Sequence, residues 1–473
     1  MEAIHVNHDP KGWGPSSLKF PQIEGVEPTD DLTSLYSYID FGQKASKREE
    51  EPDDFFLVDN KLQSGSKLMS KYGQFFSKVG AAPKSRAAVP TRVTTVARPV
   101  TKRIYRDQTV SIRSNWSMIA ELSKPNNDKL SFEPGAAEEI SQYGSILTYK
   151  RSQDTSVSAL SPKILNTKVA ESRAFISSTA SADSHFEALK DRASLFITDT
   201  VLVAIMTMNR SVYPWDIQIT KSNGKIVFDK SEDSSLEQLT LNENNPEHMP
   251  DEDEPETSIN NPKRLAEEAQ RVNRAFFISS VAEPSIEFGT SFNEENLPIA
   301  IKYRKWQLSE GFGVLVRTEI DSVIEENDNK VLIKLFAVNE YDAKITGGYK
   351  EKLETKKGQI FANEIKNNSC KMSKWALKAY LAGVEFVKIG YVSRANPNVN
   401  DRHLLLHVQK IRTKDLMQDL NLSYANGWGV FRAVVEIIKN QPDGRYVMVK
   451  DPLKPVVKIY TANEDHVEDF ETR

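Results

Sequence analysis

Two carboxylates two residues apart are the first candidates for chemistry in this sequence. Glu319 and Asp321 follow the apolar run Val314-Leu315-Val316. They therefore lie at the end of a predicted strand, with both side chains on one face. Such a pair can hold a divalent cation or act in acid–base catalysis. The alternative, which the spacing alone favours, is a strand end that carries two charges as it enters solvent.

Other residues with catalytic potential are sparse. His403 and His407 are four residues apart, which on a helix would suit a metal ion, but their segment is predicted to be a strand and ordinary histidines are favoured. Cys370 is the one cysteine, which excludes an intrachain disulfide and a cysteine-based zinc site. The patterns GxxxxGK[ST], GxGxxG, HExxH and GxSxG do not occur. The sequence predicts no catalytic residue, no bound metal and no cofactor.

Composition limits the class of protein. The chain has 473 residues, of which 39% are hydrophobic and 27% charged, and its net charge is −4. A core can form, and any contact with nucleic acid must come from a local basic patch. The longest apolar run, residues 201–206, is too short to cross a bilayer, and no secretion signal opens the chain. We expect a soluble, cytoplasmic protein.

The elements that must position these residues begin at about residue 110. Thr198-Asp199 precedes an apolar helical stripe, so one of the two residues is expected to cap a helix. Asn223-Gly224 separates two alternating runs, which predicts a hairpin. Further strands are predicted at 314–316, 331–338, 385–392, 403–409, 446–449 and 456–460, and helices at 264–276, 360–382 and 423–439. This irregular alternation predicts an α+β fold, with a mixed, largely antiparallel sheet core and packed helices.

The chain divides into three predicted parts: an extended tail over residues 1–110, a domain over 111–462 with an inserted acidic loop at 235–256, and a short C-terminal tail over 463–473. The tail has isolated apolar residues that are candidates for docking to another protein, the alternative being incidental hydrophobes: Trp13, Phe56 and Leu57. Its stretch 78–106 carries basic residues and no acidic ones. Candidates there for contact with RNA or the ribosome, the alternative being a solubilising linker, are Lys84, Arg86, Arg92, Arg98, Lys102 and Arg103.

The order of several short motifs resembles one family. The globular part is similar to the d subunit of eukaryotic translation initiation factor 3. The resemblance rests on these segments, which keep their order along about three quarters of the chain: Ile197-Thr198-Asp199-Thr200, Arg210-Ser211-Val212-Tyr213, Tyr303-Arg304-Lys305-Trp306, Glu364-Ile365-Lys366-Asn367-Asn368-Ser369, Gly390-Tyr391-Val392-Ser393-Arg394, Trp428-Gly429 and Lys450-Asp451-Pro452. In the tail, Gly12-Trp13-Gly14-Pro15 and Leu57-Val58-Asp59 are also similar to the family.

The resemblance implies a domain with the fold of the DXO/Rai decapping nucleases. In those enzymes a Glu-x-Asp strand is followed by a strand with Glu, an apolar residue and Lys. Glu319 and Asp321 match the first half, and Lys334-Leu335-Phe336 stands in place of the second. A cation would then replace a metal-binding acid, and a phenylalanine the catalytic lysine. We therefore expect a nuclease-like scaffold without nuclease activity.

The resemblance also implies a site for the 7-methylguanosine cap of messenger RNA, built from two helical regions. The candidate residues are Asp199, Val212 and Tyr213 in the first region and Gln270, Asn273 and Arg274 in the second. Asp199 would accept hydrogen bonds from the base, and Tyr213 would supply a flat face or a hydroxyl. Without the resemblance, Asp199 could be only a helix cap and Tyr213 a core aromatic. Arg274 stands where the family has a histidine, and Gln270 where it has a threonine.

Residues 235–249 correspond to a segment that the family uses as a gate over the cap-binding tunnel. The gate candidates are Ser235, Leu236, Glu237, Glu243, Glu247 and Met249. Their carboxylates, and those that follow, are expected to repel an RNA backbone; the alternative is a solvated acidic loop without a gating role.

The resemblance therefore implies an mRNA cap-binding subunit of the initiation factor, with other subunits (chiefly the e subunit), the small ribosomal subunit and capped mRNA as partners. The alternatives are a metal-dependent decapping enzyme of the same fold and a purely structural subunit without cap affinity.

Overall fold

The structure of the protein, a computed structural model, describes residues 108–155, 157–170, 179–231, 234–290, 300–326, 329–452 and 454–462. The docking candidates Trp13, Phe56 and Leu57, the basic residues between 84 and 103, and the segment 463–473 lie outside the described residues. The division into tail, domain and C-terminal segment stays a prediction.

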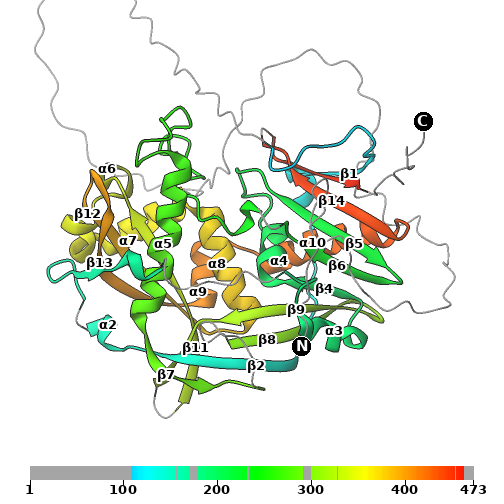
Figure 1. Ribbon diagram of the computed structural model, residues 1–473, viewed down its shortest axis with the longest axis horizontal. Helices are drawn as coiled ribbons and strands as arrows, with labels where there is room; N and C mark the ends of the chain where they lie inside the picture. The colour runs from blue at the N-terminus through cyan, green and yellow to red at the C-terminus, as the bar shows by residue number, and fades with distance from the viewer. Residues whose placement is uncertain are drawn as a thin grey trace, which may run out of the picture. The chain divides into compact units, whose positions relative to one another are not determined.

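A 15-stranded sheet runs through the described part of the chain, in the order β1-β15-β14-β5-β6-β4-β9-β8-β2-β10-β11-β12-β13-β3, with β7 paired to β2 (Figure 1). The strands are β1 Met118–Ser123, β2 Glu138–Tyr149, β3 Lys163–Leu165, β4 Leu195–Thr198, β5 Asp216–Ser222, β6 Lys225–Asp229, β7 Val281–Glu287, β8 Ala300–Ser309, β9 Phe312–Ile320, β10 Ser322–Glu326, β11 Asn329–Glu340, β12 Phe386–Asn396, β13 Val399–Arg412, β14 Gly444–Lys450 and β15 Val456–Thr461.

The helices pack against this sheet. They are α1 Lys124–Asn127, α2 Ser152–Thr155, α3 Ser184–Ala188, α4 Asp199–Met206, α5 Pro262–Ser280, α6 Ala343–Thr346, α7 Tyr349–Asn367, α8 Ser369–Ala382, α9 Thr413–Asp419 and α10 Tyr424–Lys439, with short 3-10 turns η2 Thr167–Ala170, η3 Lys190–Arg192 and η4 Ser235–Glu237. None of the described helices combines the length and the apolarity that crossing a bilayer requires.

The predicted fold class is confirmed. Most strand pairs are antiparallel, and the parallel ones are β4 with β6 and with β9, β10 with β2, and β11 with β12. Strand β2 changes partner along its length, pairing with β8 through its first half and with β10 and β7 through its second. Because a parallel pair needs a crossover connection, helices must lie over the sheet, as α4, α8 and α10 do (Figure 1).

Local signals placed the elements at Asp199 correctly. Thr198 caps α4, its hydroxyl accepting a hydrogen bond from the backbone N–H of Val201. All eight residues of α4 are buried, because the helix is apolar around its circumference and packs between the sheet, α8 and α10. The predicted hairpin is formed by β5 and β6, with Asn223 and Gly224 at φ angles of 50° and 71°.

The predicted helix over residues 360–382 is wrong as one element. It is divided between α7 and α8 by Asn368, whose backbone is not helical (φ −130°, ψ 33°). The Asn368 side-chain oxygen accepts a hydrogen bond at 2.9 Å from the backbone N–H of Asn242, 126 residues away. A long-range contact therefore competes with the helix at this point. Gly383 ends α8 in the left-handed conformation (φ 68°) that glycine adopts readily.

Candidate functional site

Asp199 lies where β4 passes into α4, and it is only 4% exposed. Its Oδ1 accepts a hydrogen bond from the hydroxyl of Thr200 at 3.3 Å. Its Oδ2 is buried and has no hydrogen-bond partner within the part of the chain that the structure describes. A buried carboxylate oxygen without a donor costs free energy. Oδ2 is therefore suited to accept a hydrogen bond from a ligand.

A lysine lies beside this carboxylate but does not form a close ion pair with it. Lys378 of α8 donates a hydrogen bond from Nζ to the hydroxyl oxygen of Thr200 at 2.7 Å, and the same Nζ is 3.8 Å from Asp199 Oδ1. The Thr200 hydroxyl accepts this hydrogen bond and donates its own to Asp199 Oδ1. The three residues form a chain that ends on Oδ1 and leaves Oδ2 unused.

The two carboxylates of the sequence motif are held by cations. Asp321 follows β9; its Oδ1 is 2.7 Å from Nζ of Lys334 on β11, and its Oδ2 accepts the backbone N–H of Leu335 at 2.7 Å. Glu319 accepts a hydrogen bond from Arg317 at 2.8 Å. Burial works to lower the pKa of Lys334, but the charges of Asp321 and Asp199 outweigh it and the pKa is raised. Lys334 therefore stays charged between these acids.

The next position along β11 is apolar and filled. Phe336 stacks on Trp375 of α8, with ring centroids 4.7 Å apart and planes 5° from parallel. Both side chains are buried. Across the described ranges, moreover, no group of three His, Cys, Asp or Glu residues is arranged to hold a metal ion.

Val212 and Tyr213 come to the same edge of the sheet as Asp199. Strand β6 is parallel to β4 and antiparallel to β5, so β5 begins where β4 ends. Two strand spacings separate β4 from β5, about 10 Å. Both side chains are half-buried, and the turn that carries them is held by Ser211, whose hydroxyl donates to the carbonyl of Tyr213 at 3.1 Å. The first group of predicted residues is thus brought together at one sheet edge.

The second group lies on α5. The side-chain oxygen of Asn273 accepts the backbone N–H of Ala337 at 2.9 Å, which ties α5 to β11 next to Phe336. Gln270 and Arg274 are half-buried. Burial lowers the pKa of Arg274, and the charge of Glu237 opposes that shift. Arg274 is therefore within electrostatic range of Glu237 in the predicted gate segment.

The gate segment bridges the two groups. Leu236 of η4 is buried in the core that contains α4, and the hydroxyl of Ser235 donates to the carbonyl of Pro214, next to Tyr213, at 3.3 Å. Five residues later, Leu241 packs against Leu265 and Ala269 of α5. Residues 235–241 thus run from the Asp199 side to the Arg274 side.

Two different kinds of contact hold this segment. Glu237 forms an ion pair with Lys230, at 2.5 Å, and its side chain is 35% exposed. Beyond it, asparagine side chains attach the segment to the junction of α7 and α8. Asn245 donates to the Asn367 side chain at 2.7 Å, and Asn244 accepts the backbone N–H of Cys370 at 2.7 Å.

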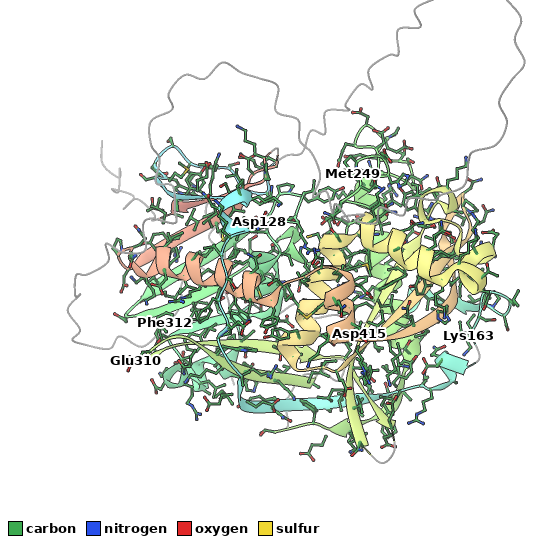
Figure 2. All side chains as sticks on the ribbon, turned by 180° about the vertical axis from the view of Figure 1, so that it is seen from behind. Asp128, Lys163, Met249, Glu310, Phe312 and Asp415 are labelled. Carbon is green, nitrogen blue, oxygen red and sulfur yellow. The ribbon has the colours of Figure 1, made fainter. Side chains whose placement is uncertain are left out.

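One expectation about the segment's charges is wrong. Glu243 does not present its carboxylate to solvent, because it is 5% exposed and accepts a hydrogen bond from the Thr240 hydroxyl at 2.5 Å. Glu247 is exposed, as expected. Met249 is half-buried and lies at the N-terminal end of α5 (Figure 2).

A shallow hollow of about 400 Å³ lies elsewhere, between residues 132–134 and the β8–β9 turn at 307–311. Glu310 and Phe312 mark this turn on the opposite side of the view from Met249 (Figure 2). None of the predicted site residues lines it, so its position gives no support to a site there.

The sequence is similar to proteins of one family over most of its length. Residues 2–461 match the family model of eukaryotic translation initiation factor 3 subunit 7. The D subunit of the same factor from Botryotinia fuckeliana is 35% identical over 391 residues, covering 77% of this chain and 67% of that protein. The D subunit from Aedes aegypti is 31% identical over 529 residues, covering 99% of this chain and 84% of that protein. The chain belongs to the d-subunit family of eukaryotic translation initiation factor 3.

Solved structures of Rai1 are similar at a lower level. The Scheffersomyces stipitis protein gives a TM-score of 0.44 with 14% identity, covering 75% of this chain and 94% of that one. The Schizosaccharomyces pombe protein gives 0.40 with 11% identity, covering 72% and 99%. At these scores the similarity supports no inference about chemistry in this member of the family.

Two charged residues at the site were missed from the sequence. Lys378 reaches Thr200 across 178 residues, and no local pattern pairs them. Arg317 lies between Glu319 and Asp183, whose Oδ2 is 3.2 Å from its Nε. The alternation along residues 314–320 could have placed Arg317 on the same strand face as Glu319, but not beside Asp183.

Proposed function

We propose that this protein binds the 5′ 7-methylguanosine end of messenger RNA in translation initiation. The observation that carries the proposal is the buried Asp199, whose Oδ2 has no donor among the described residues. The methylated base is cationic, and its Watson–Crick edge offers N–H donors. A preformed, buried carboxylate with one unused oxygen is complementary to both properties.

The remaining cap-site residues would complete recognition. Tyr213 lies in the turn before β5, which begins near the end of β4. It can offer an aromatic face or a hydroxyl to the base. Arg274, on the far side of the gate segment, can bind phosphate, and the charge of Glu237 would no longer compete for it once the gate segment has moved. Asn273 is already bound to β11, so we assign it the role of holding α5 in position.

The gate segment would open at η4. Glu237, whose side chain is 35% exposed, makes its ionic contact, whereas the contact of Asn245 with Asn367 behind it is buried. A ligand that binds better to the open state shifts the population toward it. We therefore propose that η4 swings away while residues 242–248 stay attached to α7 and α8.

We further propose that this protein is not a nuclease. Lys334 is paired with Asp321 and Arg317 with Glu319, the two acids that a metal would need, and Phe336 is packed on Trp375. Incubation of the chain with capped RNA and Mn²⁺ should give no cleaved product. Release of a capped nucleotide would contradict this proposal.

The proposed partners follow from the family and the tail. As a member of the d-subunit family, the chain belongs to the initiation factor complex. We propose that the region of Trp13, Phe56 and Leu57 contacts the e subunit, and that the basic stretch at 78–106 contacts RNA of the small ribosomal subunit in the cytoplasm. These residues lie outside the described ones, so the proposal rests on their sequence.

The decisive experiment replaces one carboxylate by its isosteric amide. Crosslinking of a capped RNA 5′ end to the chain in its complex should fall to background in Asp199→Asn. The matched control is Asp216→Asn, also buried, at 3% exposure, but on β5. Equal crosslinking by both variants and by the unchanged chain would reject the proposal.

A further inference from the structure

Lys378 has two features that the proposed cap site does not yet use. Its side chain is 25% exposed, while that of Asp199 beside it is 6% exposed. Its Nζ lies closer to the Thr200 hydroxyl, at 2.7 Å, than to the carboxylate, at 3.8 Å. The lysine is therefore hydrogen-bonded to the hydroxyl and not closely paired with the carboxylate, and part of its side chain is open to solvent.

The free and the ligand-bound site have different electrostatic needs. Without a ligand, the buried charge of Asp199 needs a nearby cation, and Lys378 supplies it. A cationic base that donates to Asp199 Oδ2 would neutralise the same carboxylate from the other side. Two cations would then compete for one anion, and Lys378 would gain by turning to a new negative partner.

A nucleotide with a cationic base also carries a negative partner for Lys378, its phosphate chain. We infer that Lys378 exchanges its partner on binding: it neutralises Asp199 in the free protein and pairs with the phosphate chain of a cationic purine nucleotide in the bound one. This inference rests on the proposed function. It makes Lys378 a residue that selects ligands carrying both a positive base and a polyphosphate, because only such a ligand satisfies both charges.

Neighbouring cations cannot take this role. Lys334 is bound to Asp321 and is 5% exposed, and Arg317 is bound to Asp183 and Glu319. Lys378 can also move at the cost of its hydrogen bond to Thr200 alone, because its long side chain leaves the α8 backbone in place.

The test separates base from phosphate. 7-methylguanosine and its 5′-triphosphate compete with a capped RNA for crosslinking to the full chain in its complex. In Lys378→Met the triphosphate should compete roughly tenfold less well, while the nucleoside competes as well as before or better. Lys374→Met, one turn earlier on α8 and also half-buried, is the matched control and should change neither. Lys378→Arg keeps the charge and should stay within about threefold.

A second readout distinguishes ligand contact from a structural role. Loss of one phosphate contact should make the salt dependence of capped-RNA binding shallower by about 0.7 in the log–log slope. Equal losses for nucleoside and triphosphate, or an unchanged triphosphate, would overturn the inference while leaving cap binding intact. If neither ligand competes with the unchanged chain, the proposed function itself fails, and the inference with it.

Discussion

Lys334 and Lys378 each lie beside an aspartate, but only one of the two pairs is closed. Lys334 is 2.7 Å from Asp321, both oxygens of Asp321 are used, and the lysine is buried. Lys378 is 3.8 Å from Asp199, which keeps an unused oxygen. A closed pair contributes to the fold and leaves no place for a ligand. An open pair stores an unsatisfied charge, and this is where a ligand can bind.

The largest effect should come from breaking the closed pair. Lys334→Met leaves Asp321, whose side chain is 19% exposed, without its cation, so we expect the free energy of unfolding to fall by about 3 kcal/mol. Denaturant titration measures the loss. The double variant Lys334→Met, Asp321→Asn removes the stranded charge and should recover much of it. A loss below about 1 kcal/mol in the single variant would show that the pair is not needed for the fold.

Lys371, a buried lysine on α8, adds a pH dependence of stability to this comparison. Lys371 has no carboxylate within ion-pair distance among the described residues, and burial lowers its pKa to about 8, although Glu364 and Glu243 oppose the shift. Between pH 8 and the ordinary lysine value near 10.4, the unfolded chain binds more protons than the folded one, so this residue makes stability rise with pH.

The rise is at most about 1.4 kcal/mol per pH unit. Lys371→Met should be more stable than the unchanged chain at pH 7.5, and the difference should shrink by pH 9.5. Denaturant titrations at the two pH values measure it. A difference that does not depend on pH would mean that Lys371 is charged in the fold throughout this range.

Local features were predictable from the sequence, and distant pairings were not. The hairpin of β5 and β6 followed from Asn223-Gly224, and the cap of α4 from Thr198-Asp199, because each signal lies within a few residues of its effect. The break at Asn368 had no local signal, since its partner is 126 residues away.

In the candidate site, too, the residues could be predicted but their long-range contacts could not. The family resemblance selected Asp199 and Tyr213, and the strand order brings both to one sheet edge. It could not reveal that Asp199 keeps an unused oxygen, because that depends on where Lys378 points. It also treated Glu243 as a solvent-facing charge, whereas the hydroxyl of Thr240 and the surrounding core enclose it.

The open pair should matter little for stability. Asp199→Asn removes a buried charge whose cation, Lys378, stays 3.8 Å away and is hydrogen-bonded to Thr200 instead, so we expect the free energy of unfolding to change by no more than about 1 kcal/mol. Asp321→Asn, which leaves Lys334 without its partner, is the comparison and should cost several times more. Denaturant titration of both variants gives the ratio. Equal losses would remove the distinction between an open and a closed pair.

The smallest effect should come from the ionic contact of the gate segment. Glu237 pairs with Lys230 and acts electrostatically on Arg274. Glu237→Gln weakens both interactions, but the amide oxygen can still accept a hydrogen bond from Lys230, so we expect a loss of about 1 kcal/mol or less and a rise in cap affinity of about threefold. Competition of cap analogue against capped-RNA crosslinking measures it, with Glu247→Gln, exposed on the same segment, as control. A rise in both variants would point to general charge repulsion of RNA, whereas a fall in Glu237→Gln would mean that Glu237 supports the site instead of closing it.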